Sequence, residues 1–353
     1  MWKALARAVT LTFSFTFSFS FTGLLPMIPA AQADPIADFY RGRSLDMIVP
    51  TSPGGDYDVR ARLIARHLGR HIPGNPTIVA RNMPSGVGIG AANYIAKVAA
   101  RDGSVLHAIM QSIPTAQAIG KSGLEADVRT FHWLGNTTES PNVINAWHTT
   151  GIRTIQDAME RELVVGSSGA ASPAFIYPNA LNLLVGTKFR IVSGYPGGNE
   201  INIAMEKGEV GGRGSNVWVS WKRGHPHWIA EKKIDILVQV ALKRAPDLPD
   251  VPLMLELAKN DEDRQVLTFL SADTPISRAF VTTPGVPAER VAALRKAFEA
   301  TLKDPELLAE AEKTRMEITF TPGEECHRIA EAIVNTPPAV LARAKVLMEG
   351  PAR

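Results

Sequence analysis

The residues best suited to chemistry form a small-residue loop after an apolar run, Pro53-Gly54-Gly55-Asp56-Tyr57-Asp58. Two adjacent glycines let backbone N–H groups turn toward one point, and a helix beginning at Val59 would add the positive end of its dipole. Such a loop can bind a carboxylate or phosphate. A second loop of this kind runs from Asn82 to Gly90. The two loops together predict an anion site.

Each loop also has a purely structural explanation. Pro53-Gly54-Gly55 would serve as a tight connection between a strand and a helix. Asp58 is better suited to cap the helix and brace the loop than to contact a ligand, because its charge would repel a carboxylate. Gly86 to Ala91 matches the G-x-G-x-x-A dinucleotide fingerprint, but Asp102 precedes the next predicted strand instead of ending it. We therefore expect no cofactor.

The loops lie between elements that alternate in type. Apolar runs and helical spacing predict strands at 45–49, 77–80 and 104–110, with helices from 59 and over 92–99. From Gly151 the pattern restarts, and small-residue loops again follow strands, at Gly166–Pro173 and Ser193–Asn199. This alternation implies parallel sheets, which bind ligands at the carboxyl ends of their strands. The elements predicted beyond Gly151 are strands at 163–165, 189–192, 234–240 and 279–282, and helices at 155–160, after Pro173, at 288–303 and at 324–335.

The N-terminus has the parts of a cleaved signal peptide. Lys3 and Arg7 precede an apolar stretch, and Ala31-Gln32-Ala33 supplies a small-x-small cleavage site. We expect cleavage after Ala33, with residues 1–33 removed, although an uncleaved membrane anchor is the alternative. No later stretch approaches the roughly 20 apolar residues that span a bilayer. The mature protein is therefore expected to be exported and soluble.

Charge and cysteine content exclude several classes of protein. Lys and Arg number 38 against 35 Asp and Glu, and loss of Lys3 and Arg7 leaves a net charge of +1. This balance provides no electrostatic footprint for nucleic acid. The single Cys326 cannot form an internal disulfide, and we interpret it as an incidental thiol.

No motif predicts catalysis or a metal site. Gly166-Ser167-Ser168-Gly169 fails the G-x-S-x-G nucleophile pattern because residue 170 is alanine. His225-Pro226-His227 is the closest histidine pair in the sequence, and Pro226 prevents the helical spacing of a ligand pair. Trp218, Trp221 and Trp228 have the spacing of an amphipathic helix, which favours core packing over stacking on an aromatic ligand.

The order of these motifs resembles the periplasmic receptors of tripartite tricarboxylate transporters, the Bug or TctC-like family. Its Pro-Gly-Gly-x-x-Asp loop corresponds to Pro53–Asp58, and its Asn-x-Pro-Gly-rich loop to Asn82–Ala91. The resemblance covers essentially all of the mature chain. The further matching segments are Asp102-Gly103, Gly166–Pro173, Tyr195–Gly198, Gly208–Val210 and Arg244–Pro252.

The resemblance implies a two-lobed α/β fold of the type II periplasmic binding protein class, a Venus flytrap. Each lobe would hold a mixed, mainly parallel sheet flanked by helices. Lobe 1 would comprise residues 34–142 and 244–353, and lobe 2 residues 143–243. Hinges are expected near 138–146 and 240–246.

The resemblance also implies a small carboxylate ligand held between the lobes. One carboxylate would contact the first two loops, and closure would add the loops of lobe 2. The ligand-binding residues carried over in this way are Ser52, Pro53, Gly54, Gly55, Ser85, Gly86, Val87 and Gly88 in lobe 1, and Ser167, Ser168, Ser172, Tyr195, Gly197 and Gly198 in lobe 2.

The chain departs from the family pattern at three places. Thr51-Ser52 replaces bulkier residues, and Ser85 and Val87 replace the usual glycine and alanine. Gly211–Ser215 places Arg213 near a predicted strand end, where the family often has an acidic residue. Arg213 either pairs an acid group of the ligand bidentately or bonds to nearby carbonyls at the surface.

We interpret the chain as a non-catalytic, monomeric receptor that passes its ligand to the permease subunits of such a transporter. One alternative is an exported hydrolase or lyase acting on small acids, which would need a positioned base that the sequence does not offer. The other is a sensory receptor that presents its closed lobes to a signalling partner.

Overall fold

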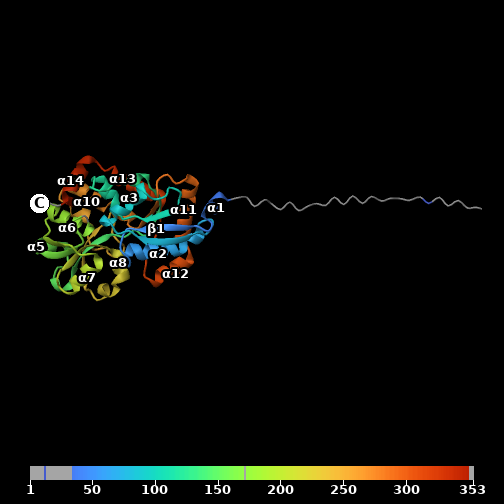
Figure 1. The fold of residues 1–353 in the computed structure, drawn as a ribbon. Helices are drawn as coiled ribbons and strands as arrows, with labels where there is room; N and C mark the ends of the chain where they lie inside the picture. The colour runs from blue at the N-terminus through green and yellow to red at the C-terminus, as the bar shows by residue number, and fades with distance from the viewer. Residues whose placement is uncertain (1–11, 13–33, 171, 350–353) are drawn as a thin grey trace, which may run out of the picture. The chain divides into compact units, whose positions relative to one another are not determined.

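The computed structural model describes residues 12, 34–170 and 172–349. The predicted signal peptide falls almost entirely outside these residues. The description below concerns the unit that begins at Pro35. Its strands belong to two sheets, one built from both ends of this unit and one from its middle (Figure 1).

Sheet A has the strand order β11-β4-β10-β3-β1-β2. β1 pairs in parallel with β2 and β3, and β10 runs antiparallel between β3 and β4. Four of the six strands therefore point the same way. The strands are β1 (Ser44–Val49), β2 (Thr77–Asn82), β3 (Val105–Ala108), β4 (His132–Asn136), β10 (Ala279–Thr282) and β11 (Thr321–Pro322).

Sheet B has the order β7-β6-β8-β5-β9, and β5 is the one strand that runs against its neighbours. All six residues of β5 are buried, as expected for an inner strand covered on both faces. Both sheets are thus mixed with one dominant direction, as predicted. The strands are β5 (Asn142–Trp147), β6 (Leu163–Ser167), β7 (Phe189–Ser193), β8 (Gly212–Val217) and β9 (Ile234–Val240).

Helices cover the faces of the sheets because each presents one apolar stripe. In α2, the positions Ala61, Ile64 and Leu68 are fully buried. Figure 1 shows α3 and α13 above β1, and α2 and α12 below it. The α-helices are α1 (Pro35–Tyr40), α2 (Asp56–Leu68), α3 (Ile89–Lys97), α4 (Ile113–Ala118), α5 (Ile155–Glu160), α6 (Pro173–Leu184), α7 (Gly198–Glu206), α8 (Trp218–Gly224), α9 (Pro226–Ala230), α10 (Asp261–Ser271), α11 (Ala288–Leu302), α12 (Pro305–Lys313), α13 (Gly323–Val334) and α14 (Pro338–Glu349).

Six short 3₁₀ helices complete the elements of the described residues. Three of them, η1, η2 and η4, directly adjoin an α-helix or a strand, where tighter turns are common, and the others lie in loops. They are η1 (Gly69–His71), η2 (Gly86–Gly88), η3 (Val128–Thr130), η4 (His148–Thr150), η5 (Met254–Leu257) and η6 (Thr274–Ile276).

The chain passes from sheet A to sheet B once, between Asn136 and Asn142, and returns before β10. On the return, α10 packs against α6 of sheet B, and α14 packs against both α6 and α10. The side chain of Asn179 on α6 donates to the carbonyl of Leu347 on α14 at 2.7 Å. These contacts favour placing α10 and α14 beside sheet B, whereas the predicted boundary puts both in lobe 1. The lobe boundaries and hinges stay predictions.

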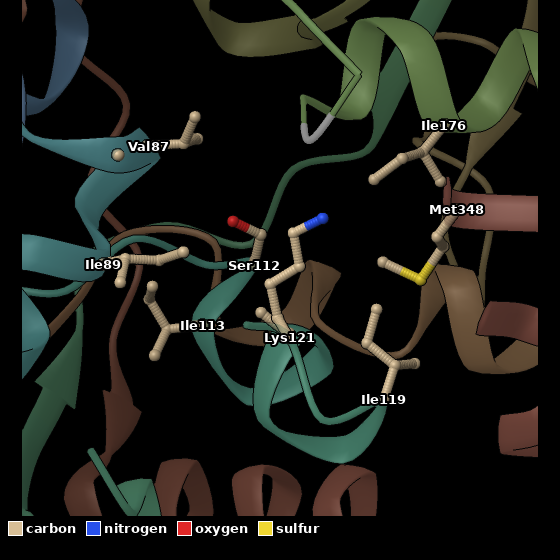
Figure 2. Close-up of a pocket in the computed structure, with 10 residues that line it drawn as sticks. Val87, Ile89, Ser112, Ile113, Ile119, Lys121, Ile176 and Met348 are labelled. Atoms are coloured by element: carbon tan, nitrogen blue, oxygen red, sulfur yellow. The ribbon is translucent and has the colours of Figure 1, made fainter. Parts of the chain in front are cut away.

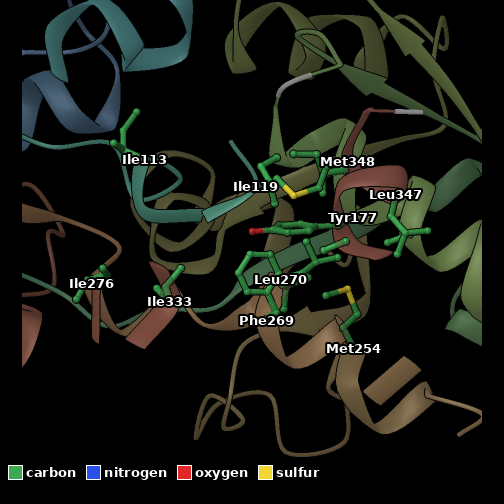
Figure 3. Close-up of a cluster of buried hydrophobic side chains, with 14 of the residues drawn as sticks. Ile113, Ile119, Tyr177, Met254, Phe269, Leu270, Ile276, Ile333, Leu347 and Met348 are labelled. Carbon is green, nitrogen blue, oxygen red and sulfur yellow. The ribbon is translucent and has the colours of Figure 1, made fainter. Parts of the chain in front are cut away.

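One hydrophobic cluster extends from sheet A to sheet B. It includes Ile113 of α4, Tyr177 of α6, Phe269 of α10 and Met348 of α14. Figure 3 shows Tyr177, Phe269 and Met348 close together, with Ile113 at the left of the view. Burial of their apolar surface therefore stabilises the two halves as one packed body.

The start of the first helix differs from the prediction. α2 begins at Asp56 with Gly55 as its N-cap, and no side chain caps it. The predicted cap, Asp58, is already the third helical residue. The prediction was wrong because Gly54, with φ of +86°, completes the turn early, so the helix starts three residues before Val59.

The packing of α6 on β8 can be tested at Gly214. A Cβ atom there would lie 2.0 Å from the carbonyl oxygen of Ala174, which is backbone and cannot move aside. We expect Gly214→Ala to cost about 1–3 kcal/mol and lower Tm by a few degrees. Gly224→Ala, where nothing lies within 4 Å, is the control and should leave Tm unchanged. Equal Tm values for the two variants would contradict this packing.

Candidate functional site

The first glycine loop is held by the buried carboxylate of Asp58. Its Oδ2 accepts the amide of Gly54 at 2.9 Å, and its Oδ1 accepts Arg62 at 2.9 Å and the side-chain amide of Asn82 at 2.8 Å. Burial alone would raise the pKa of Asp58, but these hydrogen bonds outweigh it and hold the pKa below its usual range. The predicted role as a loop brace is therefore confirmed.

The hydrogen bonds of Asp58 reduce the number of backbone N–H groups in the first loop that can donate to a ligand. The amide of Gly54, a predicted anion donor, is already bonded to Asp58. Ser52, Pro53 and Gly54 are exposed, and Gly55 is half-buried at the start of α2. Gly55, with its ordinary φ of −73°, keeps the position at the helix N-terminus that favours an anion.

Asn82 joins the first loop to the second. Its side-chain amide donates to the carbonyl of Thr51 at 2.9 Å as well as to Asp58. Beyond it, Gly86, Val87 and Gly88 all have positive φ. Val87 is β-branched, and its φ of 55° is a strained conformation for such a residue. Its side chain is 40% exposed, so core packing does not impose this strain.

The loops of sheet B brace one another in a similar way. Ser167 and Ser172 are buried, and their hydroxyl oxygens lie 3.0 Å apart. The carbonyl of Ser167 accepts the amides of Gly194 and Tyr195. The structure thus uses two of the predicted contact serines to shape the loops. Of the remaining predicted contacts, Ser168 is exposed, and Tyr195, Gly197 and Gly198 are half-buried.

Arg213 bonds to neutral acceptors. Its guanidinium donates to the carbonyls of Ser215 and Gly198 and to the side chain of Asn202 at 3.1 Å. Among the described residues no carboxylate pairs with it, and burial lowers its pKa to about 10. These bonds match the alternative in which Arg213 holds nearby carbonyls. A role in pairing the ligand stays a prediction.

The tryptophans and the cysteine belong to the core. Trp218, Trp221 and Trp228 are each at most 5% exposed, which confirms the packing interpretation. The ring of Trp228 stacks on His225 at 4.2 Å. Cys326 is fully buried, and burial raises its pKa to about 12, so the thiolate needed for reaction does not form.

An ionic cluster at Asp56 was missed by the sequence analysis. Its carboxylate pairs with Arg278 at 2.7 Å and with Arg223 of α8 at 3.4 Å, and lies 4.0 Å from Arg60. Burial raises the pKa of Asp56, yet the arginines dominate and lower it to about 2. Local spacing predicts only the Asp56–Arg60 pair of α2, because Arg223 and Arg278 come from two distant segments.

Lys222 makes a second link from α8 to the sheet A half. Its ammonium lies 2.5 Å from Glu317, which precedes β11, and 2.9 Å from Asp247. Because α8 follows β8 of sheet B, both Lys222 and Arg223 connect the two halves of the molecule.

A pocket lies between the second glycine loop and α6 (Figure 2). The pocket is partly open to solvent, and the space within it, open solvent included, is about 430 Å³. Figure 2 shows Val87 and Ile89 on one side, with Ile176 and Met348 opposite. Its walls therefore come from both halves of the fold. The lining residues are Gly86, Val87, Ile89, Ser112, Ile113, Ala116, Ile119, Lys121, Ile176 and Met348.

Of the predicted site residues, only Gly86 and Val87 line this pocket. The first loop, the serine loop and the Tyr195 loop do not. Ser112 was missed although it follows β3 at the same sheet edge as the predicted loops, so the strand-end rule could have found it. Lys121 and Met348 carry no local signal, because their role arises only from packing.

The described residues contain neither a candidate metal cluster nor a candidate membrane-spanning helix. No group of three or more His, Cys, Asp or Glu side chains is arranged to hold a metal ion. No helix among residues 34–170 and 172–349 is long and apolar enough to cross a bilayer.

Comparison with known proteins identifies the fold. A TctC solute-binding protein from Polaromonas matches with a TM-score of 0.61 and 19% identity, over 87% of this chain and 98% of its own. An adipate-bound protein of R. palustris matches with a TM-score of 0.65 and 21% identity, over 86% and 97%. The chain has the two-lobed periplasmic binding protein fold.

A third protein with this binding-protein fold is MatC from Rhodopseudomonas palustris with bound malate. It matches with a TM-score of 0.63 and 20% identity, over 87% of this chain and 99% of its own. No family model and no curated protein matches the sequence. The predicted fold class is thus confirmed by shape at low sequence identity.

The ion pairs of Asp56 predict how the stability of the fold changes at acidic pH. A carboxyl whose pKa is lower in the folded state stabilises the fold above its unfolded pKa, and this contribution is lost as pH falls toward about 2. We expect Asp56→Asn to cost at least about 2 kcal/mol at pH 7 and to flatten the fall in Tm between pH 4 and pH 2.

The control is Asp38→Asn, which removes an exposed carboxylate paired with Arg41. This variant should keep the Tm and the acid sensitivity of the wild type. If Asp56→Asn does the same, the cluster contributes nothing to stability.

Proposed function

We propose that the protein is a periplasmic receptor that captures a small carboxylate between its two lobes and delivers it to a tripartite tricarboxylate-type transporter. The observation that carries this proposal is a pocket whose walls come from the second glycine loop and from α6 of the other sheet. Solved proteins of the same fold include one with malate and one with adipate.

The strain at Val87 supports a binding role for its loop. A β-branched residue with φ of 55° costs on the order of 1–3 kcal/mol, and such strain clusters where ligands bind. Val87 is exposed and lies at the pocket wall. The loop therefore keeps a geometry that stability alone does not favour.

Capture proceeds by closure of the lobes around the acid. A ligand can close the lobes only if it binds the closed state better than the open one. The ion pairs of Arg223 with Asp56 and of Lys222 with Glu317 then stabilise the closed state. The predicted hinges near 138–146 include the segment that crosses between the sheets.

The enzyme alternative lacks a supporting arrangement. The hydroxyls of Ser167 and Ser172 bond to each other and to the carbonyl of Gly169. Within the described residues, no histidine hydrogen-bonds to either serine. A sensory receptor would bind its ligand at the same site as a transport receptor. We choose transport because the sequence resembles the receptors of tripartite tricarboxylate transporters.

We also propose that the protein is a monomer and is exported with cleavage of its signal peptide after Ala33.

Ligand binding is tested by a thermal-shift screen of dicarboxylates, tricarboxylates, aromatic acids, aliphatic acids and amino acids. An acid at about 100 times its Kd adds roughly 2.7 kcal/mol, which raises Tm by several degrees. Recovery of the acid unchanged after incubation distinguishes a receptor from an enzyme. The proposal fails if no acid raises Tm, or if the stabilising acid is chemically converted.

Gly55→Val tests the first loop without straining the backbone. The φ of Gly55 is ordinary, and its nearest neighbours to an added Cβ lie at 3.9 Å and 4.0 Å, so the variant should fold. The resemblance, which places the carboxylate of the ligand at the first loop, predicts at least tenfold weaker binding of the acid found in the screen, because the side chain would block the helix N-terminus. A ligand held only in the pocket would keep its affinity.

The matched control is Ala309→Val, which adds similar bulk at an exposed position on α12. Both variants should keep a wild-type Tm without ligand. Unchanged affinity in Gly55→Val would remove the first loop from the site.

A further inference from the structure

The pocket between the second glycine loop and α6 is largely apolar. Side chains from four separate segments form its walls and floor. Ile113, Ile119, Ile176 and Met348 are each at most 7% exposed. The apolar lining residues are Val87, Ile89, Ile113, Ala116, Ile119, Ile176 and Met348.

The floor of the pocket belongs to the main hydrophobic core. Ile113, Ile119 and Met348 line the pocket and also pack in the cluster around Tyr177 and Phe269 (Figure 3). Core side chains are close-packed and hold their positions. The apolar wall is therefore preformed, and a ligand need not order it.

One cation interrupts this lining. Lys121 follows α4 and is half-buried, and Figure 2 shows its amine directed into the space between Val87 and Ile176. Among the described residues, no carboxylate oxygen lies within 4.0 Å of its ammonium. The hydroxyl of Ser112 is the other polar side-chain group of the pocket.

These features suit an anion with an apolar body. The geometry points to a monocarboxylic acid with an aliphatic chain, whose carboxylate pairs with Lys121 and Ser112 and whose chain lies against Ile113, Ile119 and Met348. This inference rests on the proposed function, because it names the class of carboxylate that the receptor takes.

The same features disfavour a second acid group. A carboxylate buried against isoleucine and methionine side chains without a partner loses its hydration and gains nothing in return. The other cations near the loops are already engaged. Arg213 bonds to Ser215, Gly198 and Asn202, and Arg278 pairs with Asp56.

Calorimetric titration of the full mature protein tests the ligand class. The probes are butanoate, hexanoate and octanoate, with adipate, malate and citrate for comparison. We expect the Kd to fall about fourfold for each methylene added to the monoacid, until the pocket is filled. Adipate should bind at least tenfold more weakly than hexanoate, which has the same number of carbons.

Two results separate this inference from the proposed function. If adipate, malate or citrate binds more tightly than every monoacid, the ligand class is wrong but the receptor stands. If none of the acids in the wider screen binds, the receptor fails and the ligand class fails with it.

Lys121→Met tests the position of the carboxylate. The substitution keeps an unbranched side chain, one atom shorter, and removes its charge, so hexanoate should bind at least tenfold more weakly. Hexan-1-ol, which has the same chain without the charge, should keep its affinity. Lys303→Met, at an exposed position just after α11, is the control and should change neither Kd. Equal losses for hexanoate and hexanol would place the carboxylate elsewhere.

Ala116→Leu tests the position of the chain. Ala116 is half-buried on α4, and a larger side chain there would fill part of the pocket without disturbing the buried residues beneath. We expect octanoate to lose at least tenfold in affinity while butanoate loses less than twofold. A uniform loss, or none, would overturn the assignment of the apolar body to this pocket.

Discussion

The buried carboxylate of Asp58 is the interaction on which the geometry of the site depends. It accepts hydrogen bonds from Gly54 of the first loop, from Arg62 of α2 and from Asn82 at the start of the second loop. One ionised group therefore fixes two loops and a helix relative to one another. A buried charge is costly unless its partners are in place, so this arrangement selects a single loop geometry.

The second constraint is the continuity of the core between the two sheets. α10 and α14 pack against α6, and Met348 of α14 lines the pocket. The same apolar side chains thus stabilise the fold and present a surface to a ligand. In the binding mode that we propose, selectivity is set by the two polar side chains of the pocket, Lys121 and Ser112, and by the space that the core leaves free.

Local patterns predicted much of the fold. β9 (Ile234–Val240) and α5 (Ile155–Glu160) match their predicted ranges, because β-branched runs and helical spacing are local properties. The start of α2 was misplaced because a glycine turn decides it. The Asp56 cluster and Lys121 were missed, because partners distant in sequence create them. The sequence suggests that Ser167 and Ser172 donate to a ligand, but in the structure their hydroxyl groups form hydrogen bonds within their own loop.

A crystal structure of the protein with the acid that raises its Tm most would test the central claim directly. The account predicts one molecule of the acid in the pocket between the second glycine loop and α6, with its carboxylate within hydrogen-bonding distance of a loop amide, Ser112 or Lys121. An empty pocket with the acid bound at the outer surface, or displacing Asp56 from its arginines, would contradict it.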